Sequence, residues 1–304
     1  MSKKSANSST ITSTNAAKAK ETSMAMKELL RSISYCSTAE RRERICRILS
    51  DKGIAYDIER DDKAINLVVG DPADSLVTIC GHYDIVPGSC GANDNGSSCT
   101  VMLDLIEKFY DEPGLCFVFL DRAESGFYGS SLHFSRYNPA LTVNLDVVGG
   151  GEHLVYQTMV RGYEDGSCPT DSHNVDPMER LASLLEGKSC GLAGFLDMFA
   201  CQRFHALKVS SLPMCDTHNI ARLGHEVVTF SAFPEKDAAI IRKTGHLSCT
   251  EVMKYMHNGC YDDIEYICTD TMQEVEDLLE FFIISCRDSG MRCMVGRYLN
   301  RASR

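Results

Sequence analysis

Apolar and polar positions follow one another along the chain in blocks that alternate between strand and helix spacing. Three short apolar runs, typical of buried strands, cover residues 75–80, 115–121 and 140–149. Apolar residues recur at helical spacing over 97–111 and in a long closing segment, 271–289. This alternation predicts an α/β fold, a three-layer sandwich in which helices cover both faces of a mostly parallel, mixed central sheet.

Shorter patterns extend the prediction towards both ends of the chain. Segments with strand character cover 54–60, 65–70, 205–211 and 224–233, and a short helix is expected over 131–137. The 304 residues contain no internal repeat and no interdomain linker. We therefore expect a single domain over residues 25–304.

The first 24 residues have a different composition. They are rich in Ser, Thr, Ala and Lys and nearly lack large apolar side chains, so we expect a flexible tail over 1–24. Helical spacing begins at Met24. A second helix is predicted after Ser37, which forms a capping box with Glu40, and it should end near Gly53.

Charge and composition limit which binding partners and cellular locations are expected. The net charge is −11 and the chain has no sustained basic stripe, which argues against nucleic-acid binding. No apolar stretch approaches the roughly 18 residues of a membrane span, and no signal peptide is evident. The 15 cysteines are odd in number and contain no CxxC pair. We expect free thiols and a cytoplasmic, reducing location.

Polar residues cluster where the predicted strands end. His82 and Asp84 follow the first buried strand, Asp94 precedes the next helix, and Glu124 and Asp146 come after the following two strands. Taken singly, an acidic residue after a strand is usually a helix cap or a solvated turn. Four such positions on one edge of a sheet, where α/β folds gather ligands, point instead to a shared site.

The residue types at this edge favour a particular chemistry. Imidazole with several carboxylates suits Zn²⁺, Co²⁺ or Mn²⁺. A carboxylate shared between two ions gives a two-metal site, with the ions about 3.5–4 Å apart, that polarises a carbonyl and activates water. Asp84, two residues after His82, can accept the second N–H of the imidazole and fix its tautomer.

Four motifs carry a family resemblance: GHYD, GANDNGS, AESGFYGS and NLDVVGGG, in that order and spacing. They resemble the zinc exopeptidases of the M28 type, which include aminopeptidases and glutaminyl-cyclase-like enzymes. Residues 215–230 and 255–267 resemble, more loosely, two later segments of that family, so the resemblance covers residues 26–285.

The resemblance implies a role for each candidate ligand. His82 and Asp146 would hold one ion, Glu124 and His257 the other, and Asp94 would bridge both. His246 and His218 compete with His257, which we favour because an Asp-Asp-Ile-Glu sequence follows it at 262–265. We expect ordinary structural or surface roles for the other histidines, at 133, 153, 173, 205 and 225. The resemblance also implies a cis peptide between Asp94 and Asn95.

One motif departs from the family pattern. The family has two adjacent glutamates, the first a general base and the second a ligand. The Gly-x-x-Gly-Ser frame at 126–130 makes Glu124 the ligand and places Ala123 at the base position. Alanine cannot carry a proton, and losing a general base costs a factor of about 10²–10⁴ in rate. A second departure is Met256, where the family often has an oxyanion-supporting tyrosine; Tyr255 is one step earlier.

Two explanations of Ala123 remain open: a natural pseudoenzyme that binds a peptide-like ligand, or a Glu→Ala variant of an active enzyme. We favour the second because every ligand position is intact.

The function expected from the resemblance is hydrolysis of an amide bond next to a free amino group, assisted by two divalent ions, with zinc the leading candidate. The substrate would be a peptide or small amide, with loops between Tyr163 and Leu212 setting specificity. Alternatives are a binding protein that uses the metal site as a pocket, and a single-zinc acyltransferase of the glutaminyl-cyclase type. The oligomeric state is left open.

Overall fold

The chain is described by a computed structural model, which places residues 6–159, 191–210, 212, 215–244 and 249–288. Its centre is one eight-stranded sheet with the order β1-β2-β4-β3-β5-β8-β6-β7. The strands are β1 (Asp57–Arg60), β2 (Ile65–Val69), β3 (Val77–His82), β4 (Leu115–Leu120), β5 (Leu141–Leu145), β6 (His153–Met159), β7 (Leu207–Lys208) and β8 (Val227–Phe233).

The middle of the sheet is parallel and its flanks are antiparallel. Strands β4, β3, β5 and β8 run in parallel, whereas β2 joins β4 and β6 joins β8 in antiparallel pairs. In the register of β3 with its neighbours, His82 lies opposite Leu120, and Cys80 lies opposite Asn144. The carboxyl ends of β3, β4 and β5 therefore reach the same edge together.

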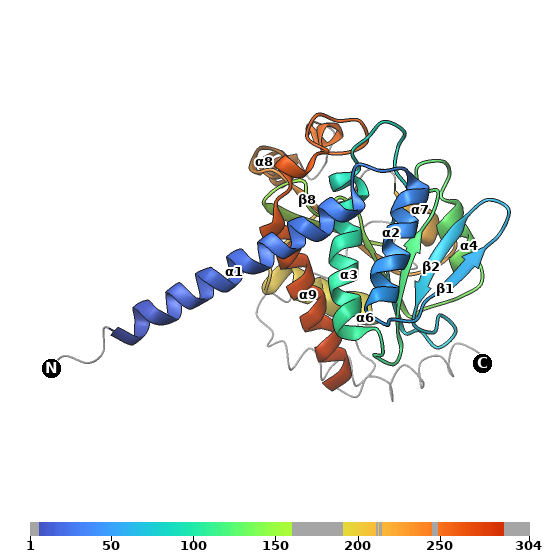
Figure 1. Cartoon of the computed structure of the whole chain (residues 1–304), viewed down its shortest axis with the longest axis horizontal. Coiled ribbons are helices and arrows are strands. Elements are labelled where there is room, and N and C mark those ends of the chain that lie inside the picture. Colours follow the sequence, from blue (N-terminus) through green and yellow to red (C-terminus); the bar gives the residue numbers. More distant parts are fainter. Residues whose placement is uncertain (1–5, 160–190, 211, 213–214, 245–248, 289–304) are drawn as a thin grey trace.

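Helices cover both faces of the sheet (Figure 1). The helices are α1 (Ala6–Ile33), α2 (Thr38–Asp51), α3 (Ser98–Phe109), α4 (Tyr128–Phe134), α6 (Gly191–Gln202), α7 (Asp216–Arg222), α8 (Glu235–Thr244) and α9 (Thr269–Asp288). Helices α1, α3, α6 and α9 pack on one another, and α4 packs on α7. The predicted three-layer α/β sandwich is confirmed.

The alternation of side chains along the strands builds two apolar layers. In β4, Phe117 and Phe119 face the layer that includes α3 and α9, whereas Val118 and Leu120 join Phe134 in the layer with α4. The parallel strands β3, β4, β5 and β8 are buried on both faces, as expected for strands between helices. This explains why the sequence shows continuous apolar runs here.

Helix α1 differs from the sequence prediction. It begins at Ala6, within the segment expected to be a flexible tail, rather than at Met24. Ala, Lys and Glu are strong helix formers, so helix propensity extends the helix where no apolar stripe is available. Its N-terminal part points away from the body in Figure 1, and its buried apolar residues are Met26, Leu30 and Ile33.

The capping box, the strand expected over 205–211 and the cysteines were also predicted from the sequence. The capping box of Ser37 and Glu40 is present at the start of α2. The strand expected over 205–211 is reduced to the two residues of β7. All cysteines of the described segments carry free thiols. None of the helices described here has the length and apolarity needed to cross a membrane.

Candidate metal centre

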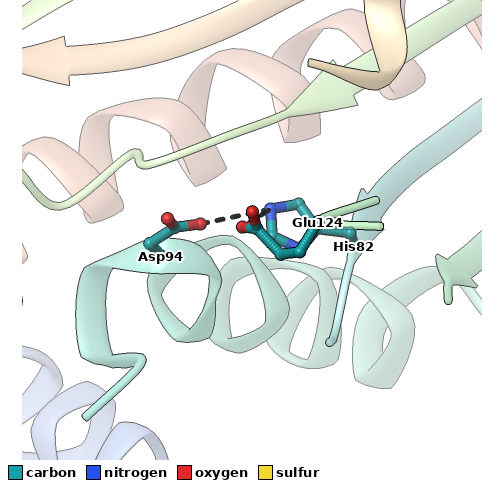
Figure 2. Close-up of side chains that lie close together, drawn as sticks. All are labelled: His82, Asp94 and Glu124. Carbon is teal, nitrogen blue, oxygen red and sulfur yellow. Dashed lines mark ion pairs between the residues drawn. The ribbon is translucent and has the colours of Figure 1, made fainter. Parts of the chain in front are cut away.

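The predicted ligands from the ends of β3, β4 and β5 and from the Asp94 turn meet around the imidazole of His82; Figure 2 shows His82 with Asp94 and Glu124. Its Nε2 lies 3.2 Å from Asp94 Oδ1, 3.7 Å from Asp146 Oδ1 and 3.9 Å from Glu124 Oε1. The ligand atoms of His82, Asp94 and Glu124 lie within 4.8 Å of one another. Residues from three strand ends and one turn are thus brought together by the register of the sheet.

His257 completes the group from a distant part of the chain. Its Nε2 lies 3.1 Å from Glu124 Oε2 and 3.6 Å from Asp94 Oδ2. Its backbone N–H also donates to Asp94 Oδ2 over 2.9 Å. Among the three histidines considered for this position, His257 pairs with the carboxylates, His218 lies in α7, and His246 lies outside the described residues.

Asp94 stands between the two imidazoles. Its Oδ1 faces His82 and its Oδ2 faces His257, so its two oxygens address two different groups of side chains. This is the geometry that a bridging carboxylate requires. The turn that carries it, η1 (Ala92–Ser97), contains the expected cis peptide between Asp94 and Asn95.

Asp84 lies next to the centre, on the Nδ1 side of His82. Its Oδ1 lies 3.2 Å from His82 Nδ1, the nitrogen that does not face the other carboxylates. The same carboxylate accepts hydrogen bonds from the backbone N–H groups of Ala123 and Glu124, over 3.0 and 3.1 Å. Asp84 therefore connects the strand end of His82 with the loop of Glu124, in the place predicted for an outer-shell residue.

The electrostatics of the group favour a bound cation. Burial and the nearby carboxylates Asp94, Asp84 and Asp146 raise the pKa of Glu124 to about 8, against the opposing effect of His82. Burial alone would lower the pKa of His82, but the facing carboxylates raise it well above its ordinary value. Asp146 Oδ1 is buried and has no hydrogen-bond partner among the described residues. Two imidazoles and three carboxylates form a donor set that fits zinc.

Comparison with known proteins agrees with this arrangement. The model of peptidase family M28 matches residues 65–186, the segment that carries His82, Asp94, Glu124 and Asp146. This segment of the chain is similar to peptidase family M28. The aminopeptidase YwaD of Bacillus subtilis is 35% identical over 83 residues, which are 24% of this chain and 18% of YwaD. The chain thus matches less than a fifth of that curated relative.

Solved structures share the fold of the chain at low sequence identity. Glutaminyl cyclase from Porphyromonas gingivalis has a TM-score of 0.58 at 14% identity, over 86% of this chain and 98% of the cyclase. The LapA aminopeptidase of Legionella pneumophila has a TM-score of 0.54 at 14% identity, over 87% of this chain and 68% of LapA. At these identities the likeness concerns the fold.

The register of the motif at 123–130 is constrained by the glycines within it. A Cβ on Gly129 would lie 2.4 Å from the Asp121 carbonyl oxygen and 2.5 Å from the Asp121 nitrogen, so only glycine fits there. This supports the motif alignment in which Glu124 is the ligand and Ala123 takes the base position. Ala123 is buried and contributes its N–H to Asp84 but no proton-carrying group.

Neither candidate for the oxyanion-supporting residue reaches the centre in the described structure. Met256 is buried in an apolar cluster with Val252 and Phe233. Tyr255 stacks against Tyr261, with ring centroids 5.1 Å apart. Burial, followed by the charge of Asp237, raises the pKa of Tyr255, and none of its acidic neighbours is a predicted ligand.

Two buried aspartates next to the centre were not assigned roles from the sequence. The Asp262 carboxylate accepts the backbone N–H groups of Gly91, Asn93 and Asp94 and the hydroxyl of Ser89. Asp216, at the start of α7, is 1% exposed, and neither of its oxygens has a hydrogen-bond partner among the residues described. The only sequence signal for either was its position in the two looser family segments.

The other histidines were expected to have ordinary structural or surface roles, and three of them have partners that are not candidate ligands. His133 faces Glu59, His153 faces Glu235, and His225 contacts the Phe134 carbonyl. His205 lies in a turn after α6. His173 lies outside the described residues, as do residues 163–190 of the predicted specificity segment.

Proposed function

We propose that the chain is built as a metal-dependent hydrolase of an amide bond next to a free amino group, with two divalent ions, zinc above all. The observation that carries the proposal is the carboxylate of Asp94, which offers one oxygen to His82 and the other to His257. The M28 match and the aminopeptidase relative support this class of reaction.

The residues divide into two groups around Asp94. His82 and Asp146 would hold one ion, and Glu124 and His257 would hold the other. Divalent ions bound there supply Lewis acidity, which polarises a carbonyl and lowers the pKa of water. Asp84 faces His82 Nδ1 at 3.2 Å, which leaves Nε2 for the ligand role, and it aligns Glu124 by accepting its backbone N–H.

Position 123 is where a proton would be exchanged with water and with the leaving amine. The methyl group of Ala123 cannot do this, so we expect this chain to be strongly impaired in hydrolysis while it still binds metal and peptide. We favour a Glu→Ala variant of an active enzyme over a natural pseudoenzyme because the surrounding ligand set is intact.

The test is Ala123→Glu, assayed on a panel of aminoacyl arylamides and dipeptides with two equivalents of zinc. We expect hydrolysis to rise by about 10²–10⁴-fold, the contribution of a positioned general base. Ala123→Gln has a similar size without the ionisable group and should stay at the level of the parent chain.

Background hydrolysis by Ala123→Glu with two ions bound would contradict the hydrolase proposal. It would favour the binding-protein alternative, in which the metal centre holds a peptide without cleaving it. Retention of uncleaved dipeptide by the parent chain, measured by calorimetry, would then define its ligand.

A single-zinc acyltransferase of the glutaminyl-cyclase type is the second candidate. It is supported by the near-complete coverage of the Porphyromonas gingivalis cyclase and by the compact three-residue group of His82, Asp94 and Glu124. Metal analysis of the purified chain separates the candidates: two ions per chain favour the hydrolase, and one tightly bound ion favours the acyltransferase.

A further inference from the structure

Asn95 follows the bridging Asp94 and is fully buried. Its side-chain amide donates to the Leu145 carbonyl over 2.9 Å, and its side-chain oxygen accepts from the Val147 N–H over 3.0 Å. The opposite orientation of the amide would place like groups against each other, so this network fixes it. These two peptide groups flank Asp146, so one side chain of the Asp94 turn holds the backbone on both sides of another ligand.

The backbone after Asp146 needs such support. Val147 has a φ of 52°, in the left-handed region that β-branched residues rarely adopt. Such a conformation is unfavourable and persists only where the surroundings hold it. Strand β8 supplies one side, because Asp146 N–H donates to the Phe230 carbonyl and Ala232 N–H donates to the Val147 carbonyl. Asn95 holds this backbone from the other side, through its bonds to the Leu145 carbonyl and the Val147 N–H.

The carboxylate of Asp146 depends on this backbone for its position. Its Oδ1 lies 3.7 Å from His82 Nε2 but has no hydrogen-bond partner within the described segments. Space for the support is provided by Gly81, where an added Cβ would lie 2.9 Å from the Leu145 carbonyl oxygen and 3.5 Å from Asn95 Nδ2. The glycine before His82 thus allows Asn95 to reach Leu145.

The second group of ligands is held by other bonds. Glu124 is aligned through its N–H to Asp84, and His257 through its N–H to Asp94. Ser89 bonds to both Asp262 and the His257 carbonyl. None of these bonds passes through the amide of Asn95.

We propose that Asn95 is a positioning residue of the metal centre. Its amide holds the backbone on both sides of Asp146, and therefore the geometry of the ion position that Asp146 shares with His82. Loss of the amide weakens that position and spares the Glu124/His257 position. The inference rests on the two-ion arrangement of the proposed function.

The test is a titration of metal-free full-length chain with Zn²⁺ by calorimetry and with Co²⁺ by visible absorption, which reports coordination geometry. In Asn95→Ala we expect one of the two binding steps to weaken by about 10–100-fold, as for other outer-shell partners, and the other step to stay unchanged. Asn95→Asp keeps an acceptor for Val147 but sets a carboxylate oxygen against the Leu145 carbonyl, so it should weaken the same binding step.

Asn219→Ala is the matched control. Asn219 is also buried, but its amide donates to Ser130, Ser131 and the Phe127 carbonyl rather than to the backbone beside a predicted ligand, so both binding steps should match the parent chain. Circular dichroism establishes that each variant is folded. If Asn95→Ala does not fold, Asn95→Asp is compared with Asn219→Ala instead.

Two parent-like binding steps in folded Asn95→Ala would overturn the inference. A parent chain that binds a single ion would contradict the two-ion function, and Asn95 would then be judged by whether its substitution weakens that ion more than Asn219→Ala does. A chain that binds no ion would overturn both.

Discussion

Single side chains connect the candidate ligands to one another through hydrogen bonds and ion pairs, and Asp84 is the clearest example. It faces His82 Nδ1 with one oxygen and accepts the N–H groups of Ala123 and Glu124 with both. A neutral amide of the same shape can accept on one side only and presents a donor on the other. Asp84 is therefore sensitive to a substitution that preserves its volume.

We predict that Asp84→Asn lowers the affinity for Zn²⁺ by about 10–100-fold, because the imidazole loses its orienting acceptor and the Glu124 loop loses one N–H partner. Calorimetric titration of the metal-free protein measures the change. Asp74→Asn, on an exposed loop before β3, serves as the control. Equal affinities in the two variants would show that Asp84 does not orient His82.

Between elements, the approach of β3 to β5 determines whether the strand ends meet. The strands pair from Val77 with Leu141 to Cys80 with Asn144, and Gly81 continues this close approach next to Leu145. A methyl group at Gly81 would meet a backbone oxygen, which cannot move aside as a flexible side chain can.

We expect Gly81→Ala to reduce the free energy of unfolding by about 1–3 kcal/mol, the usual cost of overpacking, and to weaken metal binding. Denaturant unfolding gives the first quantity and calorimetry the second. At Gly53 an added Cβ meets no atom, although its φ of 70° disfavours other residues. Gly53→Ala should therefore lower stability but leave metal affinity unchanged; a loss of affinity there would contradict the distinction.

Helices α3 and α9 pack on each other where the carboxyl groups of Asp104 and Glu276 interact. Burial, followed by the charges of Glu276 and Glu107, raises the pKa of Asp104 to about 7. A raised pKa means that the folded chain binds this proton more tightly than the unfolded chain. Stability from this group is therefore complete below about pH 4 and is lost as the pH rises through 7.

Asp104→Asn removes this ionisation. We expect it to increase the free energy of unfolding at pH 8 by about 1 kcal/mol and to flatten the decline between pH 4 and 7. Unfolding curves across that range measure both effects. Asp111→Asn, exposed just beyond the same helix, should leave the pH profile unchanged. A parent-like profile in Asp104→Asn would contradict the assignment.

For the molecule as a whole, the body of the fold begins within α1 rather than at its start. The buried apolar residues of this helix are Met26, Leu30 and Ile33, and its N-terminal part points away from the body (Figure 1). The packing of α1 on α3 and α9 therefore rests on its last two turns.

Deletion of residues 1–19 should change the free energy of unfolding by less than about 0.5 kcal/mol, as for surface changes in general. Leu30→Ala, in contrast, should cost about 2–5 kcal/mol because it leaves a cavity in the apolar layer. Thermal and denaturant unfolding of the two variants make the comparison. A deletion as damaging as Leu30→Ala would place the edge of the folded body earlier in the chain.

The sequence by itself predicted the layered α/β fold and the four candidate ligands His82, Asp94, Glu124 and Asp146. Continuous apolar runs specify strands buried on both faces, and parallel strands bring His82, Glu124 and Asp146 to one edge because their carboxyl ends align. The helix start at Ala6 was missed because the first residues of this helix are good helix formers but lack the regularly spaced apolar positions from which a helix is predicted.

The tertiary structure decided how these ligands are held. The bonds of Asn95 to Leu145 and Val147, and of Asp262 to the Asp94 turn, join residues about 50 and 170 positions apart, which no local pattern records. The same holds for His257, brought to Asp94 by a backbone hydrogen bond across 163 positions. Local composition determines which side chains can bind a metal, whereas long-range packing determines the distances between them.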